Sequence, residues 1–102
     1  MLTNEKVLEV FSDYLLQDPD YEVVMTSRGY TVMGWNDGTK EWFDVQYCGT
    51  PEALRDELLS TYKNYLESII TQGRGLEHED LTEQEAADIR AKQNALMDKC
   101  QA

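Results

Sequence analysis

The side chains best suited to nucleophilic chemistry are two cysteines, Cys48 and Cys100, together with a single histidine, His78. A catalytic cysteine needs a thiolate, which a neighbouring base or a helix N-terminus can stabilise. Cys48 comes just before a helix-start signal at Thr50, but the chain has no second histidine from which to build a Cys/His pair. We therefore expect free thiols that behave as small hydrophobic residues, and we predict that the protein is not an enzyme.

The acidic segment around His78 is the other place where side-chain chemistry is conceivable. It reads Glu77-His78-Glu79-Asp80, and its carboxylates are oxygen ligands of the kind that bind cations. A metal site needs ligands that converge on one point, and adjacent loop residues rarely converge without help from elsewhere in the chain. The sequence therefore predicts no metal ion, and no motif in it predicts a cofactor.

The charge is strongly negative, with 20 acidic and 9 basic residues and a formal net charge of −11. The acids are spread over both halves of the chain, so the whole molecule should repel phosphate backbones and anionic lipids. We predict no direct binding to nucleic acid. The acidity can serve solubility, or it can mimic a nucleic acid through a phosphate-like row of side chains: Glu77, Glu79, Asp80, Glu83, Glu85 and Asp88.

The N-terminal residues 1–9 lack the basic and apolar regions of a signal peptide. No stretch approaches the roughly 20 apolar residues that span a bilayer. We therefore predict a cytoplasmic protein that does not enter a membrane.

Three alternating runs between residues 21 and 47 predict a three-stranded antiparallel meander. A two-residue loop at Arg28-Gly29 would join the first two strands, and a turn over residues 36–39 would join the second and third. These turns predict the following opposed pairs: Met25 with Val32, Trp35 with Trp42, Val32 with Val45, and Tyr30 with Tyr47.

The alternation sorts the strand residues onto two faces. Gly34 is expected to make room beside Phe43 on the face that packs against helices. The predicted core face comprises Tyr21, Val23, Met25, Tyr30, Val32, Phe43, Val45 and Tyr47. The predicted outer face comprises Glu22, Val24, Thr26, Thr31, Met33, Trp35, Trp42, Asp44 and Gln46.

The outer face has an apolar centre formed by Val24, Met33, Trp35 and Trp42. Large aromatic side chains on an open sheet face often anchor interfaces. Two interpretations stay open from the sequence. The tryptophans could form a small cluster covered by the chain itself, or they could form the surface that binds a partner.

Helix signals surround the sheet. Thr3 is a predicted N-cap for a helix that runs to Gln17, and Thr50 with Pro51 opens a long helix to about residue 71. A connector over residues 73–81 leads to a capping box at residues 82–85 and a helix over 82–99. The prediction is a single α+β domain over residues 1–102, in the order α-β-β-β-α-α, with helices packed on one sheet face. The last helix could dock weakly, cover the outer sheet face or pack on another copy.

The order helix, three strands, helix is also that of double-stranded-RNA-binding domains. Those domains place lysines at the start of their second helix, whereas residues 50–56 here read TPEALRD. The architecture is therefore the most that the two share.

A second resemblance covers nearly the whole chain, through residues 2–8 (LTNEKVL), 21–26 (YEVVMT), 29–32 (GYTV) and 50–55 (TPEALR). These segments resemble small uncharacterised accessory proteins of conjugative and integrative elements of Gram-positive gut bacteria. The resemblance implies a bacterial cytoplasmic setting and a role in element maintenance, transfer or defence evasion. It implies no activity and no functional residue.

The functional prediction from sequence is a non-catalytic interaction or regulatory module. It would bind a protein partner, or a second copy of itself, through the outer sheet face around Trp35 and Trp42. The alternative is an acidic inhibitor that mimics nucleic acid and occupies a DNA- or RNA-binding protein. An enzyme built on Cys48 or on the carboxylates is the third hypothesis.

Overall fold

The computed structural model describes residues 1–72 and 81–101. Helices and one antiparallel sheet follow one another in the predicted order, so the predicted α+β class is confirmed. The elements are α1 (Asn4–Val10), α2 (Ser12–Gln17), β1 (Tyr21–Thr26), β2 (Gly29–Asn36), β3 (Glu41–Cys48), α3 (Pro51–Thr71) and α4 (Glu83–Gln101). All of the predicted connector except Leu81 lies outside the described residues.

The three predicted helix starts are all present. The hydroxyls of Thr3, Thr50 and Thr82 each accept a hydrogen bond at 3.1 Å from the backbone N–H three residues later. The Glu85 carboxylate accepts in return from the Thr82 N–H at 3.0 Å, which completes the capping box. Local sequence therefore fixes where α1, α3 and α4 begin.

The prediction of one continuous helix up to Gln17 is wrong, because Phe11 separates α1 from α2 with φ −94° and ψ 5°. The Ser12 hydroxyl donates to the Glu9 carbonyl at 2.9 Å, a side-chain bond that competes with regular helix geometry. The Phe11 side chain is completely buried. The break therefore lies at a residue that the core holds in place.

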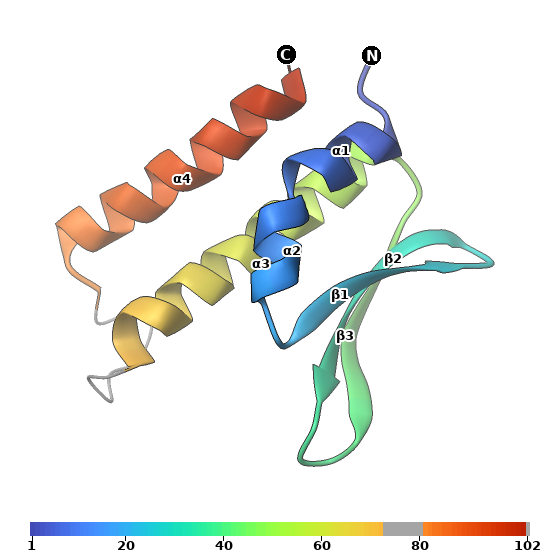
Figure 1. Ribbon diagram of the computed structural model, residues 1–102, viewed down its shortest axis with the longest axis horizontal. Coiled ribbons are helices and arrows are strands. Elements are labelled where there is room, and N and C mark those ends of the chain that lie inside the picture. The colour runs from blue at the N-terminus through green and yellow to red at the C-terminus, as the bar shows by residue number, and fades with distance from the viewer. Residues whose placement is uncertain (73–80, 102) are drawn as a thin grey trace.

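Helix α4 packs on α1 and α3, on the side of α3 that faces away from the sheet (Figure 1). The Gln93 side chain donates to the Leu59 carbonyl of α3 at 3.1 Å and helps to hold this contact. The sequence left open whether this helix docks weakly, covers the outer sheet face or packs on another copy, and the structure shows it docked on the other helices of the chain. The outer face of the sheet is not where α4 lies.

The sheet has the order β1-β2-β3, so β2 is central and β3 is an edge strand. The first hairpin differs from the prediction, since Met25 lies opposite Tyr30 and Val32 lies opposite Val23. The Thr26 hydroxyl accepts from the Arg28 N–H at 3.1 Å and stabilises a turn one residue earlier than predicted. The register moves by two residues, so the predicted faces of β1 and β2 are unchanged.

The second hairpin contains a β-bulge that the sequence prediction missed. Trp35 lies opposite Trp42 as predicted, but beyond the bulge Val32 lies opposite Gln46 and Tyr30 opposite Cys48. The predicted pairs of Val32 with Val45 and of Tyr30 with Tyr47 are therefore wrong. The register changes because β3 has an extra residue opposite Met33. This residue lies next to Asp44, whose φ of 51° is left-handed.

This shift of one residue exchanges the faces of the last part of β3. Tyr47 lies opposite Thr31 and therefore on the outer face, while Cys48 turns into the core. The Asp44 side chain lies on the helix side, where its carboxylate accepts from the Tyr21 hydroxyl at 3.0 Å. The predicted positions of Tyr47 and Asp44 are both corrected by the bulge.

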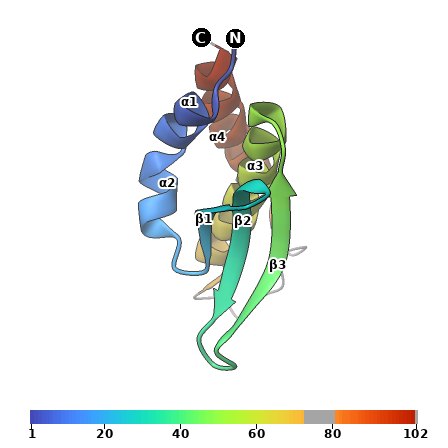
Figure 2. The same ribbon diagram turned by 90° about the vertical axis from the view of Figure 1, so that its right-hand side faces the viewer.

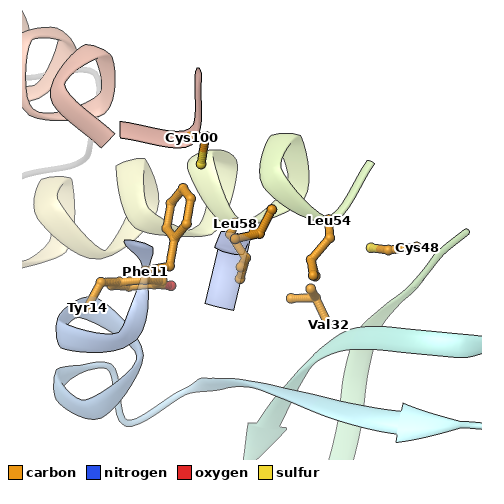
Figure 3. Packing of buried hydrophobic residues seen from close by; sticks show 8 residues of the cluster. Phe11, Tyr14, Val32, Cys48, Leu54, Leu58 and Cys100 are labelled. Atoms are coloured by element: carbon orange, nitrogen blue, oxygen red, sulfur yellow. The ribbon is translucent and has the colours of Figure 1, made fainter. Parts of the chain in front are cut away.

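The core lies between the helices and the central strand. Figure 3 shows Val32 of β2 under Leu54 of α3, and Phe11 below Cys100 of α4 and beside Leu58 of α3. The β2–β3 hairpin extends beyond the helices (Figures 1 and 2), and every residue from Glu41 to Tyr47 is exposed. Helices thus cover only part of the predicted core face.

Candidate functional site

The two tryptophans form the centre of the candidate site. Trp35 of β2 and Trp42 of β3 are cross-strand partners, with ring centroids 4.8 Å apart and ring planes tilted by 60°. Trp42 is 47% exposed, whereas Trp35 is half-buried. The two rings are therefore in contact with each other and still partly open to solvent.

Val24 and Met33 complete the predicted set, and both are half-buried. Alternation along β1 and β2 places them on the same face as Trp35, because Met33 is opposite Glu22 and Val24 is opposite Thr31. The structure thus brings all four predicted residues to one face of the sheet.

Tyr47 belongs to this face and was missed from sequence. Tyr47 is 52% exposed, and the Arg28 guanidinium lies 4.8 Å from the centroid of its ring. Such a contact is a cation–π interaction between the turn of the first hairpin and the edge strand. No sequence pattern marks the bulge that turns Tyr47 outward, because Asp44 sits in an otherwise regular alternation.

A pocket of about 330 Å³ adjoins the tryptophan pair. Its lining residues come from the turn over residues 18–20, from Leu15, Tyr21 and Glu22, and from the two tryptophans. The Trp35 backbone N–H donates to the Asp20 carbonyl at 2.7 Å and holds this turn against the sheet. The sequence predicts a helix that ends at Gln17, but no sequence signal places the turn that follows it beside the tryptophans.

The acids of this pocket have different roles. Asp18 is fixed from two sides, because it accepts from the Tyr14 hydroxyl at 2.6 Å and from the Asp20 N–H at 2.8 Å. Burial, followed by this bond to Asp18, raises the pKa of Tyr14 far above its usual value, so the hydroxyl stays a donor. Asp20 and Glu22 carry exposed side chains. The pocket therefore has one structural carboxylate and two that face solvent.

The two cysteines are buried as free thiols in the hydrophobic core. Burial raises the pKa of Cys48, and the nearby Glu57 carboxylate raises it further. Burial also raises the pKa of Cys100, against opposing effects of Arg55 and Lys6. Both thiols therefore stay protonated at neutral pH, which disfavours the thiolate that a nucleophile requires.

Three acids of the alternative acidic row lie outside the described residues, namely Glu77, Glu79 and Asp80. His78 also lies outside them. Of the other three acids, Glu83 is exposed, Glu85 belongs to the capping box, and Asp88 accepts from the Gln84 amide at 2.9 Å. Acids at the start of a helix are favoured by its dipole. The described part of the row thus has a structural explanation in α4.

Within residues 1–72 and 81–101, no cluster of His, Cys, Asp and Glu has an arrangement that could hold a metal ion. In the same residues, no helix combines the length and the apolar character needed to cross a bilayer.

Comparison of the chain with protein-family models, with curated proteins and with solved structures gave no match. The resemblance to accessory proteins of mobile elements therefore stays a prediction.

Proposed function

We propose that the protein is a non-catalytic interaction module that binds another protein through the outer face of its sheet. The observation that carries this proposal is the half-open pair of Trp35 and Trp42 on the sheet face opposite to the one that packs against α3. Tryptophan is among the residues that contribute most to binding energy when a partner covers it. A non-polar ring of this size is costly to leave in water.

The position of α4 supports the proposal. This helix packs against α1 and α3 and buries apolar side chains such as Ile89 and Cys100. Trp42, Tyr47 and Val45 remain 47%, 52% and 39% exposed. Within the described chain, these side chains therefore keep apolar area that a partner could bury.

Affinity capture tests the proposal. Wild type and the Trp35→Ser/Trp42→Ser variant serve as baits in lysate of the source organism. The matched control is Leu16→Ser/Ile69→Ser, which removes two exposed apolar side chains from the helices. Circular dichroism and urea unfolding verify that each bait is folded.

We expect a protein that wild type and the Leu16/Ile69 control recover and the tryptophan variant does not. If all three baits recover the same proteins, or none recovers any, the outer face is not the binding surface. Gel filtration of wild type measures whether the protein is a monomer or a dimer, and therefore whether a second copy could cover this face.

A further inference from the structure

The pocket beside the tryptophan pair has a composition that selects for one kind of ligand. Its walls combine two indole rings with the acidic turn over residues 18–20 and with Glu22. We propose that this pocket holds the arginine side chain of a basic segment in the protein partner. This inference rests on the proposed function and specifies the chemistry of the partner.

The pocket is large enough for one long side chain. Its volume of about 330 Å³ is at the lower end of the range of roughly 300–1,000 Å³ found for small-molecule sites. A flat guanidinium can lie against an indole face while its long aliphatic stem follows Leu15 and Pro19, which also line the pocket.

The electrostatics favour a cation. Indole faces carry negative charge density and attract a cation above the ring, and Trp is the best of the aromatic residues in this respect. The exposed carboxylates of Asp20 and Glu22 add full negative charge at the rim. None of the described residues that line the pocket is Lys or Arg.

Arginine is the better match of the two basic side chains. Its planar guanidinium stacks on aromatic rings and donates two parallel hydrogen bonds to one carboxylate, whereas the ammonium of lysine acts as a strongly hydrated point charge. The protein itself uses this contact on the same face, where the Arg28 guanidinium lies 4.8 Å from the Tyr47 ring centroid.

The overall charge favours a basic partner over a second copy of this chain. With a net charge of −11, two copies repel each other, whereas a basic segment is attracted from a distance. An acidic chain would also repel partners of its own sign, so the charge contributes to specificity as well as to the rate of association.

Tryptophan fluorescence can test the pocket directly, because the chain has only 2 tryptophans and both belong to the site. The probe is a short acetylated and amidated peptide of alternating Gly and Arg. Two comparison peptides replace Arg by Lys and by citrulline, which keeps the shape of arginine and removes its charge. We expect saturable binding of the Arg peptide, weaker binding of the Lys peptide, and a loss of about tenfold or more with citrulline.

Two variants assign the binding to the pocket. Asp20→Asn/Glu22→Gln removes the rim charges while keeping both tryptophans, and it should weaken the Arg peptide about tenfold. Glu9→Gln/Asp98→Asn removes the same number of exposed charges from α1 and α4 and should bind nearly as wild type does. Equal weakening by the two variants, or equal binding of the Arg and citrulline peptides, would overturn the inference.

The outcome also separates this inference from the proposed function. If a partner is captured through the tryptophans but the Arg peptide neither binds nor competes with it, the outer face is an interface and the arginine site is wrong. If the Arg peptide binds in the pocket as described, excess peptide should release the captured partner.

Discussion

The buried helical core and the edge strand β3 are built from similar residues and are used in opposite ways. Val7, Phe11 and Leu58 are completely buried. In β3, by contrast, every residue from Glu41 to Tyr47 is exposed. Hydrophobic burial stabilises a fold in proportion to the area removed from water. The stability of this protein therefore resides mainly in the helices and β2, and the exposed apolar area of β3 contributes less to it.

The largest expected effect on stability comes from removing a side chain from the buried core. Leu58→Ala leaves a cavity among the residues that α3 packs against the sheet and α1, and it should cost roughly 2–5 kcal/mol of unfolding free energy. Urea unfolding followed by circular dichroism measures the loss. The matched control is Leu16→Ala, at a leucine that is 87% exposed, with an expected change within about 0.5 kcal/mol. Similar losses of unfolding free energy in both variants would show that burial does not decide which residues stabilise the fold.

An intermediate effect is expected where β2 and β3 touch. A Cβ atom at Gly34 would lie 2.5 Å from the Phe43 ring, so Gly34→Ala must push that ring off the strand. The ring is partly exposed and can move, so the expected cost is about 1 kcal/mol, from its lost edge contact with Tyr21. In a Phe43→Ala background the same substitution should cost nothing further, which a double-mutant cycle by urea unfolding can test. Additive losses would mean that ring and glycine are independent.

The smallest effect is a pH dependence at the bulge. Burial, and then the bond to Asp44, raises the pKa of Tyr21 to about 12 from its ordinary value of 10.0. The folded state thus favours the protonated hydroxyl. Its stabilising contribution is complete below pH 10 and disappears as the pH rises towards 12.

The stability difference between wild type and Tyr21→Phe should therefore shrink across that pH window in urea titrations. Asp44→Asn keeps an acceptor oxygen but removes the charge, so it should narrow the window by lowering its upper end. A difference that does not change with pH would show that the Tyr21 hydroxyl contributes no pH-dependent stability.

Much of the fold was predictable because its signals are local. The threonine caps at residues 3, 50 and 82 predicted three helix starts, since each hydroxyl bonds to a backbone N–H three residues away. The close approach of Gly34 and Phe43 was also predicted and is confirmed. Such features depend on residues that are neighbours along the chain or across one turn.

The candidate site was predictable only in part. The pairing of Trp35 with Trp42 followed from the short turn between their strands. The bulge near Asp44 did not, because a left-handed φ at an aspartate leaves no mark in a pattern of alternating residues. Missing it placed Tyr47 and Asp44 on the wrong faces of the predicted sheet. The break at Phe11 was missed for a related reason, since both sides of it keep helical spacing.

The sequence by itself determined the order of elements, the helix starts, the tryptophan pair and the negative charge, because each depends on local chemistry or on composition alone. Tertiary structure decided that α4 packs on α1 and α3, that Tyr47 faces outward, and that the acidic turn over residues 18–20 forms a pocket with the tryptophans. These outcomes depend on packing between segments far apart in the chain. The hydrophobic effect that drives such packing is non-directional, so composition alone does not choose the contacting surfaces.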